Sequence, residues 1–275
     1  MMLQKVLLGT ANFVKPYGVL SDGKSLSSKT ASEVLSYAKS KGLSGLDTAL
    51  GYGNLTEVVP PQDLQGLRII TKISVLDEVN DAIQKLSATQ IPYYGILIHD
   101  PQNLAQVSAE QIQELMTGLK SAFPQAKLGI SIYEPEELYA FASYFMPDLI
   151  QIPLNPFNQI CKTDPFVEFI RSNNIEVHAR SLFLQGILLA DDLPVGLAPL
   201  KTHWLDLKKK IQGNTLPSLL SWAMAQDFVF AWVLGVSSVQ DLEQIIEALQ
   251  NQTAVPEFQP VDHPLINPKN WTFLS

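Results

Sequence analysis

The sequence contains a single cysteine, Cys161, among its 275 residues. One cysteine cannot form an internal disulfide, and it cannot supply the cysteine pairs of a structural zinc site. Such low cysteine use is typical of proteins of the reducing cytoplasm. We therefore expect a cytoplasmic protein without a bound metal.

Basic clusters and long apolar runs are also missing. The 19 Lys and Arg residues are outnumbered by 27 Asp and Glu residues, which gives a formal net charge of −8. No stretch gathers enough positive charge to bind a nucleic-acid backbone or an anionic membrane. The apolar run at residues 3–8 is interrupted by Gln4 and Lys5, so it is too short for a secretory signal or a membrane span. We expect neither nucleic acid nor a membrane as a partner.

The composition that remains is that of one globular domain. Hydrophobic residues make up 46% of the chain and charged residues 17%, without a low-complexity tract or a visible linker. A single domain spanning residues 1–275 can bury a substantial core at this length. The stretch 256–275 is Pro-rich but carries large apolar side chains, which predicts a C-terminal tail packed on the domain. These side chains are Phe258, Leu265, Ile266, Trp271 and Phe273.

Short apolar runs alternate with amphipathic helical segments along the chain. The predicted strands are Val6–Gly9, Gly45–Thr48, Arg68–Ile73, Tyr94–His99, Lys127–Ile132, Leu149–Leu154, Ile175–Ala179 and Val229–Leu234. The predicted helices are Thr30–Lys41, Val75–Ser87, Ser108–Phe123, Pro135–Tyr144, Pro165–Asn173, Leu216–Gln226 and Val239–Gln250. This alternation favours an α/β fold of the (β/α)8 TIM-barrel type. An open doubly wound sheet shares the alternation, but no G-x-G-x-x-G motif follows the first strand.

Polar residues stand at the ends of three consecutive predicted strands. Asp47 ends one strand, and Tyr52 follows it on a turn punctuated by glycines. Lys72 and His99 stand at the ends of the next two strands. Because the C-terminal ends of barrel strands face one mouth, where active sites lie, we expect these four residues to converge.

A phenol, an ammonium, an imidazole and a carboxylate together suit proton transfer to a carbonyl oxygen. The pKa of an unperturbed Tyr is ~10, so we expect the Lys72 ammonium to lower the pKa of Tyr52 and Asp47 to hold Lys72 in place. His99 would donate a hydrogen bond to the substrate carbonyl. Tyr52 would then be the acid in reduction and the base in oxidation. Taken singly, each residue also has a structural explanation, such as a cap, a snorkelling lysine or a packed histidine.

Several segments resemble the aldo-keto reductase superfamily, which consists of nicotinamide-dependent barrels with an Asp, Tyr, Lys, His tetrad. The matching segments are LGTANF at 8–13, GLDTALGYGNLTE at 45–57, IITKI at 69–73 and ILIHD at 96–100. The most specific match is the D-T-A-x-x-Y-G motif from Asp47 to Gly53, followed by Glu57. The resemblance implies reduction of an aldehyde or ketone by NAD(P)H, with a small-molecule carbonyl substrate and Tyr52 as the proton donor.

Later segments resemble the cofactor site of the family in chain order. The resemblance places Ser131 and Gln151 at the nicotinamide carboxamide, and it places Arg180 where a Tyr commonly stacks on the ring. A planar guanidinium can also stack. Ser181 and Phe183 fall on the pyrophosphate side. The resemblance places Gly235, Ser237, Ser238 and Asp241 around the adenosine 2′-phosphate, and it places Gln244 near the adenine.

The match weakens in this last segment, VLGVSSVQDLEQI. Gly235, Ser237 and Ser238 suit a phosphate at a helix N-terminus. Asp241, however, stands where the family commonly has Arg or Gln. A carboxylate repels a phosphate, but it can accept hydrogen bonds from a ribose diol. The family therefore favours NADP(H), and Asp241 indicates NAD(H) as the alternative.

Two features concern the ends of the barrel. Only Met1–Lys5 precede the first strand, so the hairpin that plugs the barrel bottom in many family members is absent or replaced by another segment. At the other end, the loop Leu182–Gly213 is among those expected to set substrate specificity. Six aromatic residues could line an apolar mouth, although packing beneath loops explains each of them equally well. They are Phe13, Tyr17, Tyr133, Phe157, Phe183 and Trp204.

Two other classes of function remain open. A redox-silent regulatory subunit could keep the barrel and bind NAD(P) as a sensor, although a sensor needs neither the acid nor its ammonium. A barrel lyase or isomerase could use Tyr52 and Lys72 without a nucleotide, and it would bind no nicotinamide at all. The sequence indicates no particular oligomeric state.

Overall fold

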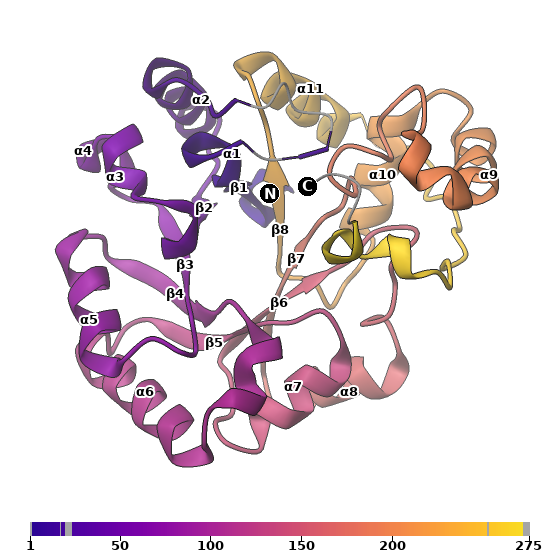
Figure 1. Cartoon of the computed structure of the whole chain (residues 1–275). Coiled ribbons are helices and arrows are strands. Elements are labelled where there is room, and N and C mark those ends of the chain that lie inside the picture. The colour runs from indigo at the N-terminus through magenta and orange to yellow at the C-terminus, as the bar shows by residue number, and fades with distance from the viewer. Residues whose placement is uncertain (1, 17, 20–23, 252, 272–275) are drawn as a thin grey trace.

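The computed structural model describes residues 2–16, 18–19, 24–251 and 253–271. Eight parallel strands close into a barrel in chain order (Figure 1), so the predicted (β/α)8 fold is confirmed. The strands lie within two residues of their predicted bounds. They are β1 (Val6–Gly9), β2 (Gly45–Asp47), β3 (Arg68–Ile73), β4 (Tyr93–Ile98), β5 (Lys127–Ser131), β6 (Leu149–Pro153), β7 (Glu176–Arg180) and β8 (Ala231–Gly235).

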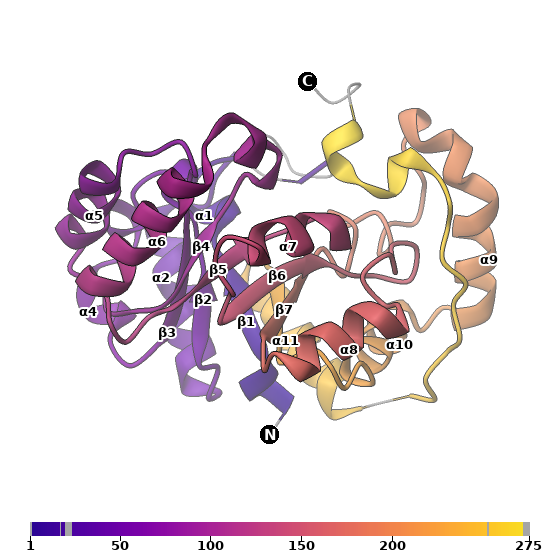
Figure 2. The ribbon, with the colours of Figure 1, turned by 90° about the horizontal axis from the view of Figure 1, so that it is seen from below.

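Helices surround the barrel, as Figures 1 and 2 show. The α-helices are α1 (Ala11–Val14), α2 (Ser28–Ser40), α3 (Leu55–Val58), α4 (Pro61–Leu64), α5 (Val79–Ala88), α6 (Ala109–Ala122), α7 (Pro135–Ala142), α8 (Asp164–Ser172), α9 (Lys201–Ile211), α10 (Thr215–Met224) and α11 (Val239–Gln250). Serine side chains cap the N-termini of α2, α6 and α11. Within the described part of the chain, no helix is long and apolar enough to cross a membrane.

Helix α9 lies inside the stretch Leu182–Gly213, which the sequence analysis treats as a loop. Its sequence, KTHWLDLKKKI, is so rich in charge that its apolar stripe is easily overlooked. Trp204, Leu207 and Ile211 recur at three- and four-residue intervals, and all three are buried. This spacing is the signal of an amphipathic helix that covers the barrel with one face.

The two faces of the barrel sheet bury separate cores. Side chains on the outer face pack with the helices into one large apolar cluster. Inside the barrel, a smaller apolar layer contains Leu7, Ile70, Leu97, Leu149 and Ala231. Because both faces of a parallel barrel are covered, its strands read as nearly continuous apolar runs. Along the strands, the inner layer lies between polar groups at the bottom and polar groups at the mouth.

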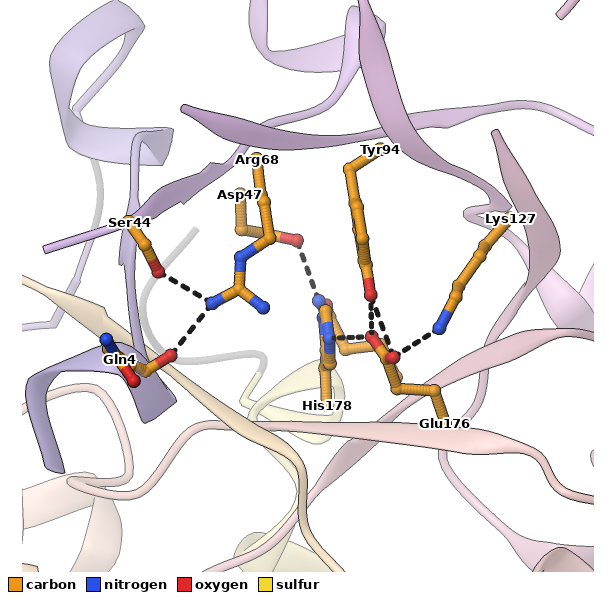
Figure 3. A network of polar contacts seen from close by, with 9 residues as sticks. Gln4, Ser44, Asp47, Arg68, Tyr94, Lys127, Glu176 and His178 are labelled. Carbon is orange, nitrogen blue, oxygen red and sulfur yellow. Dashed lines mark hydrogen bonds and ion pairs between the residues drawn. The ribbon is translucent and has the colours of Figure 1, made fainter. Parts of the chain in front are cut away.

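The N-terminal end of the barrel is filled by charged side chains (Figure 3). Glu176, at the start of β7, accepts a hydrogen bond from Tyr94 Oη at 2.9 Å and pairs with Lys127. Its other oxygen lies 2.8 Å from His178 Nε2. Arg68 donates to the Gln4 carbonyl oxygen at 2.8 Å, so it ties the short 3-10 helix η1 (Met2–Lys5) to the sheet. The network and η1 thus occupy the N-terminal end of the barrel.

Ionised Glu176 should stabilise the fold. Burial tends to raise the pKa of Glu176, but hydrogen bonds from His178 and Lys127 lower it to about 2. Because this pKa lies below the ordinary value of 4.5, the stabilisation is complete well above pH 4.5 and is lost as the pH falls toward 2. We expect Glu176→Gln to lower the free energy of unfolding by roughly 2 kcal/mol at neutral pH and by less than half of that at about pH 3.

Urea unfolding at the two pH values tests this expectation. Glu114→Gln is a suitable control, because Glu114 is an exposed carboxylate on α6. The control should change the free energy of unfolding by less than about 0.5 kcal/mol at either pH. If Glu176→Gln lowers the free energy of unfolding equally at both pH values, the charge of Glu176 is not the stabilising feature.

The described part of the C-terminal tail runs beside α9 and reaches toward the mouth of the barrel at residues 264–271, as Figure 2 shows. Phe258 and Trp271 are buried. The backbone N–H of Val261 donates to the carbonyl oxygen of Phe157 at 2.9 Å. Two short 3-10 helices, η5 (Pro264–Ile266) and η6 (Pro268–Asn270), bring the tail toward the strand ends. Phe273 lies outside the described residues.

Candidate active site

A cavity of about 300 Å³ lies at the C-terminal ends of the strands. Residues of β1, β2, β6, β7 and β8 line it, together with Tyr52 and the segment after β7. Gly9, Asp47, Arg180 and Gly235 end their strands, and Gln151 lies in the middle of β6. This is the face of a TIM barrel where active sites are built. Among the described residues, no three His, Cys, Asp or Glu side chains are grouped to hold a metal ion.

A buried ion pair lies beside this cavity. Lys72 Nζ is 2.5 Å from Asp47 Oδ1 and donates to the Thr48 carbonyl oxygen at 3.2 Å. The second carboxylate oxygen of Asp47 accepts a hydrogen bond from Gln151 Nε2 at 2.7 Å. Lys72 is 1% exposed and Asp47 is 4% exposed. Burial lowers the pKa of Lys72, and the Asp47 carboxylate opposes that effect. The two opposite charges therefore largely compensate each other.

Tyr52 and His99 lie next to this pair. The short 3-10 helix η2 (Leu50–Tyr52) presents Tyr52, and Gly53 ends it with a φ of +126°, which favours glycine. The Tyr52 and His99 rings meet edge to face, with centroids 5.6 Å apart. Lys72 Nζ is 5.9 Å from the centroid of the Tyr52 ring. The structure thus brings all four predicted residues together, although Lys72 and His99 are not among the residues that line the cavity.

The electrostatics of Tyr52 differ from the sequence-based expectation. Burial raises the pKa of Tyr52, the Asp47 carboxylate raises it further, and Arg180 lowers it. The net shift is therefore opposite to the expected lowering, because burial and the Asp47 carboxylate outweigh the cations near Tyr52. Burial also lowers the pKa of His99 to about 4, and the charges of Lys72 and Arg180 contribute to that shift. At neutral pH the site therefore holds a protonated phenol and a neutral imidazole.

The residues assigned to the nicotinamide end occupy three neighbouring strands. Ser131 ends β5, and Gln151 is its partner in β6. Gln151 Oε1 is buried and has no hydrogen-bond partner among the described residues. Arg180 ends β7, and its Nη2 donates to the Ile132 carbonyl oxygen at 3.2 Å. Gln151 and Arg180 line the cavity, whereas Ser131 is buried beside it.

The segment after β7 forms one wall of the cavity in an unusual backbone conformation. Ser181 has a φ of +64°, and Leu184 and Gln185 also have positive φ values. Such non-glycine residues cost of order 1 kcal/mol each, so their surroundings must hold them. Asn155, which is fully buried, donates from Nδ2 to the Ser181 carbonyl oxygen at 3.1 Å. Asn155 is not among the predicted site residues, and its signal in the sequence is a lone polar residue after an apolar strand.

At the other end of the cavity, Asp241 closes the N-terminus of α11. Its Oδ2 accepts a hydrogen bond from the backbone N–H of Ser237 at 2.7 Å, and its own N–H donates to Ser238 Oγ at 3.1 Å. The carboxylate thus occupies a backbone donor that an external anion would use at a helix N-terminus. Gly235 and Ser237 line the cavity, whereas Ser238, Asp241 and Gln244 do not.

Of the aromatic residues considered for the mouth, Phe183 lines the cavity. Tyr133 lies under the Arg180 guanidinium, 4.4 Å from ring centroid to Cζ. Three others belong to the hydrophobic core, as expected if they pack beneath loops. They are Phe13, Phe157 and Trp204. Tyr17 lies outside the described residues.

Comparison with known proteins agrees with this arrangement. A putative aldo-keto reductase of Pseudomonas aeruginosa is 16% identical, with 90% of each chain covered and a TM-score of 0.65. An aldo-keto reductase of Bacillus halodurans in its holo form is also 16% identical, with 94% of this chain and 88% of that chain covered and a TM-score of 0.69. At such identities the likeness shows the fold, and none of the curated proteins matches. The model of the Aldo/keto reductase family, however, matches residues 5–263, so the chain belongs to this family of oxidoreductases, which generally use nicotinamide cofactors.

Proposed function

We propose that this protein reduces an aldehyde or ketone to an alcohol, with hydride from NAD(P)H and a proton from Tyr52. The observation that carries the proposal is the grouping of Tyr52, His99 and the Lys72–Asp47 pair beside one cavity at the barrel mouth. Membership of the aldo/keto reductase family supports a nicotinamide-dependent oxidoreductase in general. The four side chains can supply the proton and the hydrogen bond that a carbonyl oxygen needs when it is reduced to an alcohol.

Each side chain has a distinct role in this proposal. Tyr52 donates the proton, because it lines the cavity and its raised pKa keeps the phenol protonated at neutral pH. His99, neutral at that pH, donates an N–H to the carbonyl oxygen and orients it. The Lys72 ammonium stabilises the phenolate that forms when Tyr52 loses its proton. Asp47 holds Lys72 at that position.

The residues at the mouth fit a nicotinamide cofactor, which supplies the hydride when it is bound. The unpartnered Gln151 Oε1 is an acceptor suited to the amide N–H group of a carboxamide. We assign Ser131 to the same group, because it pairs with Gln151 across adjacent strands. Ser181 and Phe183 line the wall that we assign to the pyrophosphate side.

For the nucleotide, we propose NAD(H) rather than NADP(H). Asp241 would repel a 2′-phosphate, and no Lys or Arg occurs in residues 211–268 to compensate for it. We expect NADH to bind at least about tenfold more tightly than NADPH. Asp241→Asn should bring the affinities for NADH and NADPH closer together. Its amide oxygen can still accept a hydrogen bond from the Ser237 N–H, but it carries no charge.

Titration with both nucleotides, followed by nicotinamide fluorescence at low and at physiological salt, checks this prediction. Glu243→Gln removes one exposed charge from the same helix and should leave the ratio unchanged. Equal or tighter binding of NADPH to the unmodified protein would contradict the role of Asp241. Another group would then have to hold the 2′-phosphate.

The same titration, together with an assay of carbonyl reduction, separates the alternative functions. A redox-silent regulatory subunit would bind a nucleotide but would reduce no carbonyl compound. A nucleotide-independent lyase or isomerase would bind neither nucleotide. If neither NADH nor NADPH binds in the micromolar range, the reductase proposal is wrong.

A further inference from the structure

Arg180 carries an uncompensated charge in the cavity. Of the residues that line the cavity, the charged ones are Asp47 and Arg180, and Asp47 is paired with Lys72. Within the described chain, no carboxylate lies within ion-pair distance of the Arg180 guanidinium. One of its nitrogens donates to the Ile132 carbonyl oxygen. A guanidinium has five N–H donors, so most of them are available to a bound group.

Two lysines extend the positive charge around the mouth. Lys15, at the end of α1, places its Nζ 4.8 Å from the centroid of the Tyr52 ring. Lys269, in η6 of the tail, places its Nζ 4.5 Å from the centroid of the Tyr133 ring, which Arg180 also covers. Neither lysine has an ion-pair partner among the residues that the structure describes. Segments far apart in sequence thus bring three cations to one opening.

The nearby carboxylates already have partners. Asp47 is bound to Lys72 and Gln151. Asp100, which follows His99, accepts hydrogen bonds from the side chains of Ser74 and Asn103. Glu137 accepts hydrogen bonds from the backbone N–H groups of Tyr133 and Glu134. Asp100 and Glu137 keep their negative charge, but neither lines the cavity, where Arg180 is the charged residue without an ion-pair partner among the described residues. An unpaired cation in a cavity attracts ligands of opposite sign, although the chain as a whole carries −8.

We propose that the substrate is an anionic carbonyl compound, an aldehyde or ketone that carries a carboxylate or a phosphate, and that Arg180 binds the anionic group. The inference rests on the proposed reductase function and names its substrate class. A planar guanidinium binds carboxylate or phosphate oxygens through paired N–H bonds. Because Arg180 and Tyr52 line the same small cavity, one substrate can engage both residues.

Arg180 acts at the reacting end of the cavity. It lines the cavity together with Tyr52, and its charge lowers the pKa of Tyr52, of Lys72 and of His99. The adenosine end, at the N-terminus of α11, is closed instead by the Asp241 carboxylate. An anion held by Arg180 is therefore placed beside the proton donor.

Matched pairs of aldehydes test the proposal. Benzaldehyde is compared with para-carboxybenzaldehyde, and glyceraldehyde with glyceraldehyde 3-phosphate, each with NADH at saturation. We expect kcat/KM to be at least about tenfold higher for the anionic member of one pair, and the pair with the larger ratio identifies carboxylate or phosphate. Arg180→Met should bring the ratio close to one, mainly through KM, and Arg180→Lys should restore part of it. Equal kcat/KM values within both pairs would overturn the proposal.

The controls distinguish this role from cofactor stacking. If Arg180 only stacks on the nicotinamide, Arg180→Met weakens NADH binding and slows neutral and anionic aldehydes by the same factor, which contradicts the proposal. Lys201→Met removes one exposed cation from α9 and should leave the ratio unchanged.

A binding measurement separates this proposal from the reductase function. Benzoate should raise the melting temperature of the NADH-bound protein, benzamide should not, and Arg180→Met should abolish the difference. If benzoate binds through Arg180 but no aldehyde is reduced, the anion site stands and the reductase function is wrong. If benzoate and benzamide shift the melting temperature equally, the anion site is wrong.

Discussion

Replacing Tyr52 with Phe should lower kcat for carbonyl reduction by about 10³-fold, because general acid catalysis of this kind contributes roughly 10²–10⁴-fold. The affinity for NADH should remain within a factor of about two, since the Phe ring keeps the shape of the site. The phenol is well placed for the role: it lines the cavity, and its raised pKa keeps it protonated. The decay of NADH absorbance gives kcat, and nicotinamide fluorescence gives the affinity.

The pH dependence of kcat provides a second test of the role of Tyr52. Burial holds the pKa of Tyr52 above its ordinary value of 10.0, and that of His99 lies near 4. Neither group changes its protonation between about pH 6 and 9, so kcat for reduction should be flat across that range if the chemical step limits it. Oxidation of the alcohol needs the phenolate, and its rate should rise steadily with pH.

Tyr144→Phe is the matched control for the Tyr52 variant, because Tyr144 lies just after α7, is exposed and carries the same phenol. It should leave both kcat and the NADH affinity unchanged. A Tyr52→Phe protein that kept more than a tenth of the original kcat would remove Tyr52 from the mechanism. The proton would then have to come from another donor, such as His99 or water.

The second large effect concerns the buried Lys72–Asp47 pair. Lys72→Met leaves the Asp47 carboxylate without its cation in a buried site, and it should lower the free energy of unfolding by about 3–5 kcal/mol. Asp47→Asn leaves the ammonium without its anion, and we expect a loss of similar size. The double variant should recover much of this loss, because no unpaired charge remains. Urea unfolding of the four proteins gives the coupling energy.

In the double variant, kcat should not recover together with the free energy of unfolding. The double variant should remain slow if the Lys72 ammonium stabilises the Tyr52 phenolate as proposed. The exposed pair Lys29–Glu33, with an N···O distance of 3.9 Å, provides the control cycle. Its coupling energy should be at most about 0.5 kcal/mol. A coupling of that same small size for Lys72 and Asp47 would contradict the central place we give to the buried pair.

Much of the barrel could be predicted from the sequence because both faces of its sheet are covered. Each strand then reads as a short apolar run, and the polar residue at its end marks the mouth. Asp47, Lys72 and His99 follow this pattern, and the structure brings them together with Tyr52. Helix α9 does not stand out in the same way, because the charge of its exposed face hides its apolar stripe.

The electrostatics could not be predicted, because they depend on distances between remote segments. The direction of the Tyr52 pKa shift follows from its burial and from the nearby Asp47 carboxylate. The role we give to Asp241 depends on its hydrogen bond to the Ser237 backbone. The uncompensated charge of Arg180 depends on the positions of every nearby carboxylate. Such information appears only when the chain is folded.

The central claim is that hydride passes from a nicotinamide to a carbonyl carbon at this mouth. The most direct test supplies NADH deuterated at the transferable position of its nicotinamide C4, together with the aldehyde pairs described above, and analyses the alcohols by mass spectrometry. We predict one deuterium on the carbinol carbon with the unmodified protein, and about 10³-fold less labelled alcohol per unit time with Tyr52→Phe. A protein that binds NADH but forms no labelled alcohol from any aldehyde would contradict the claim.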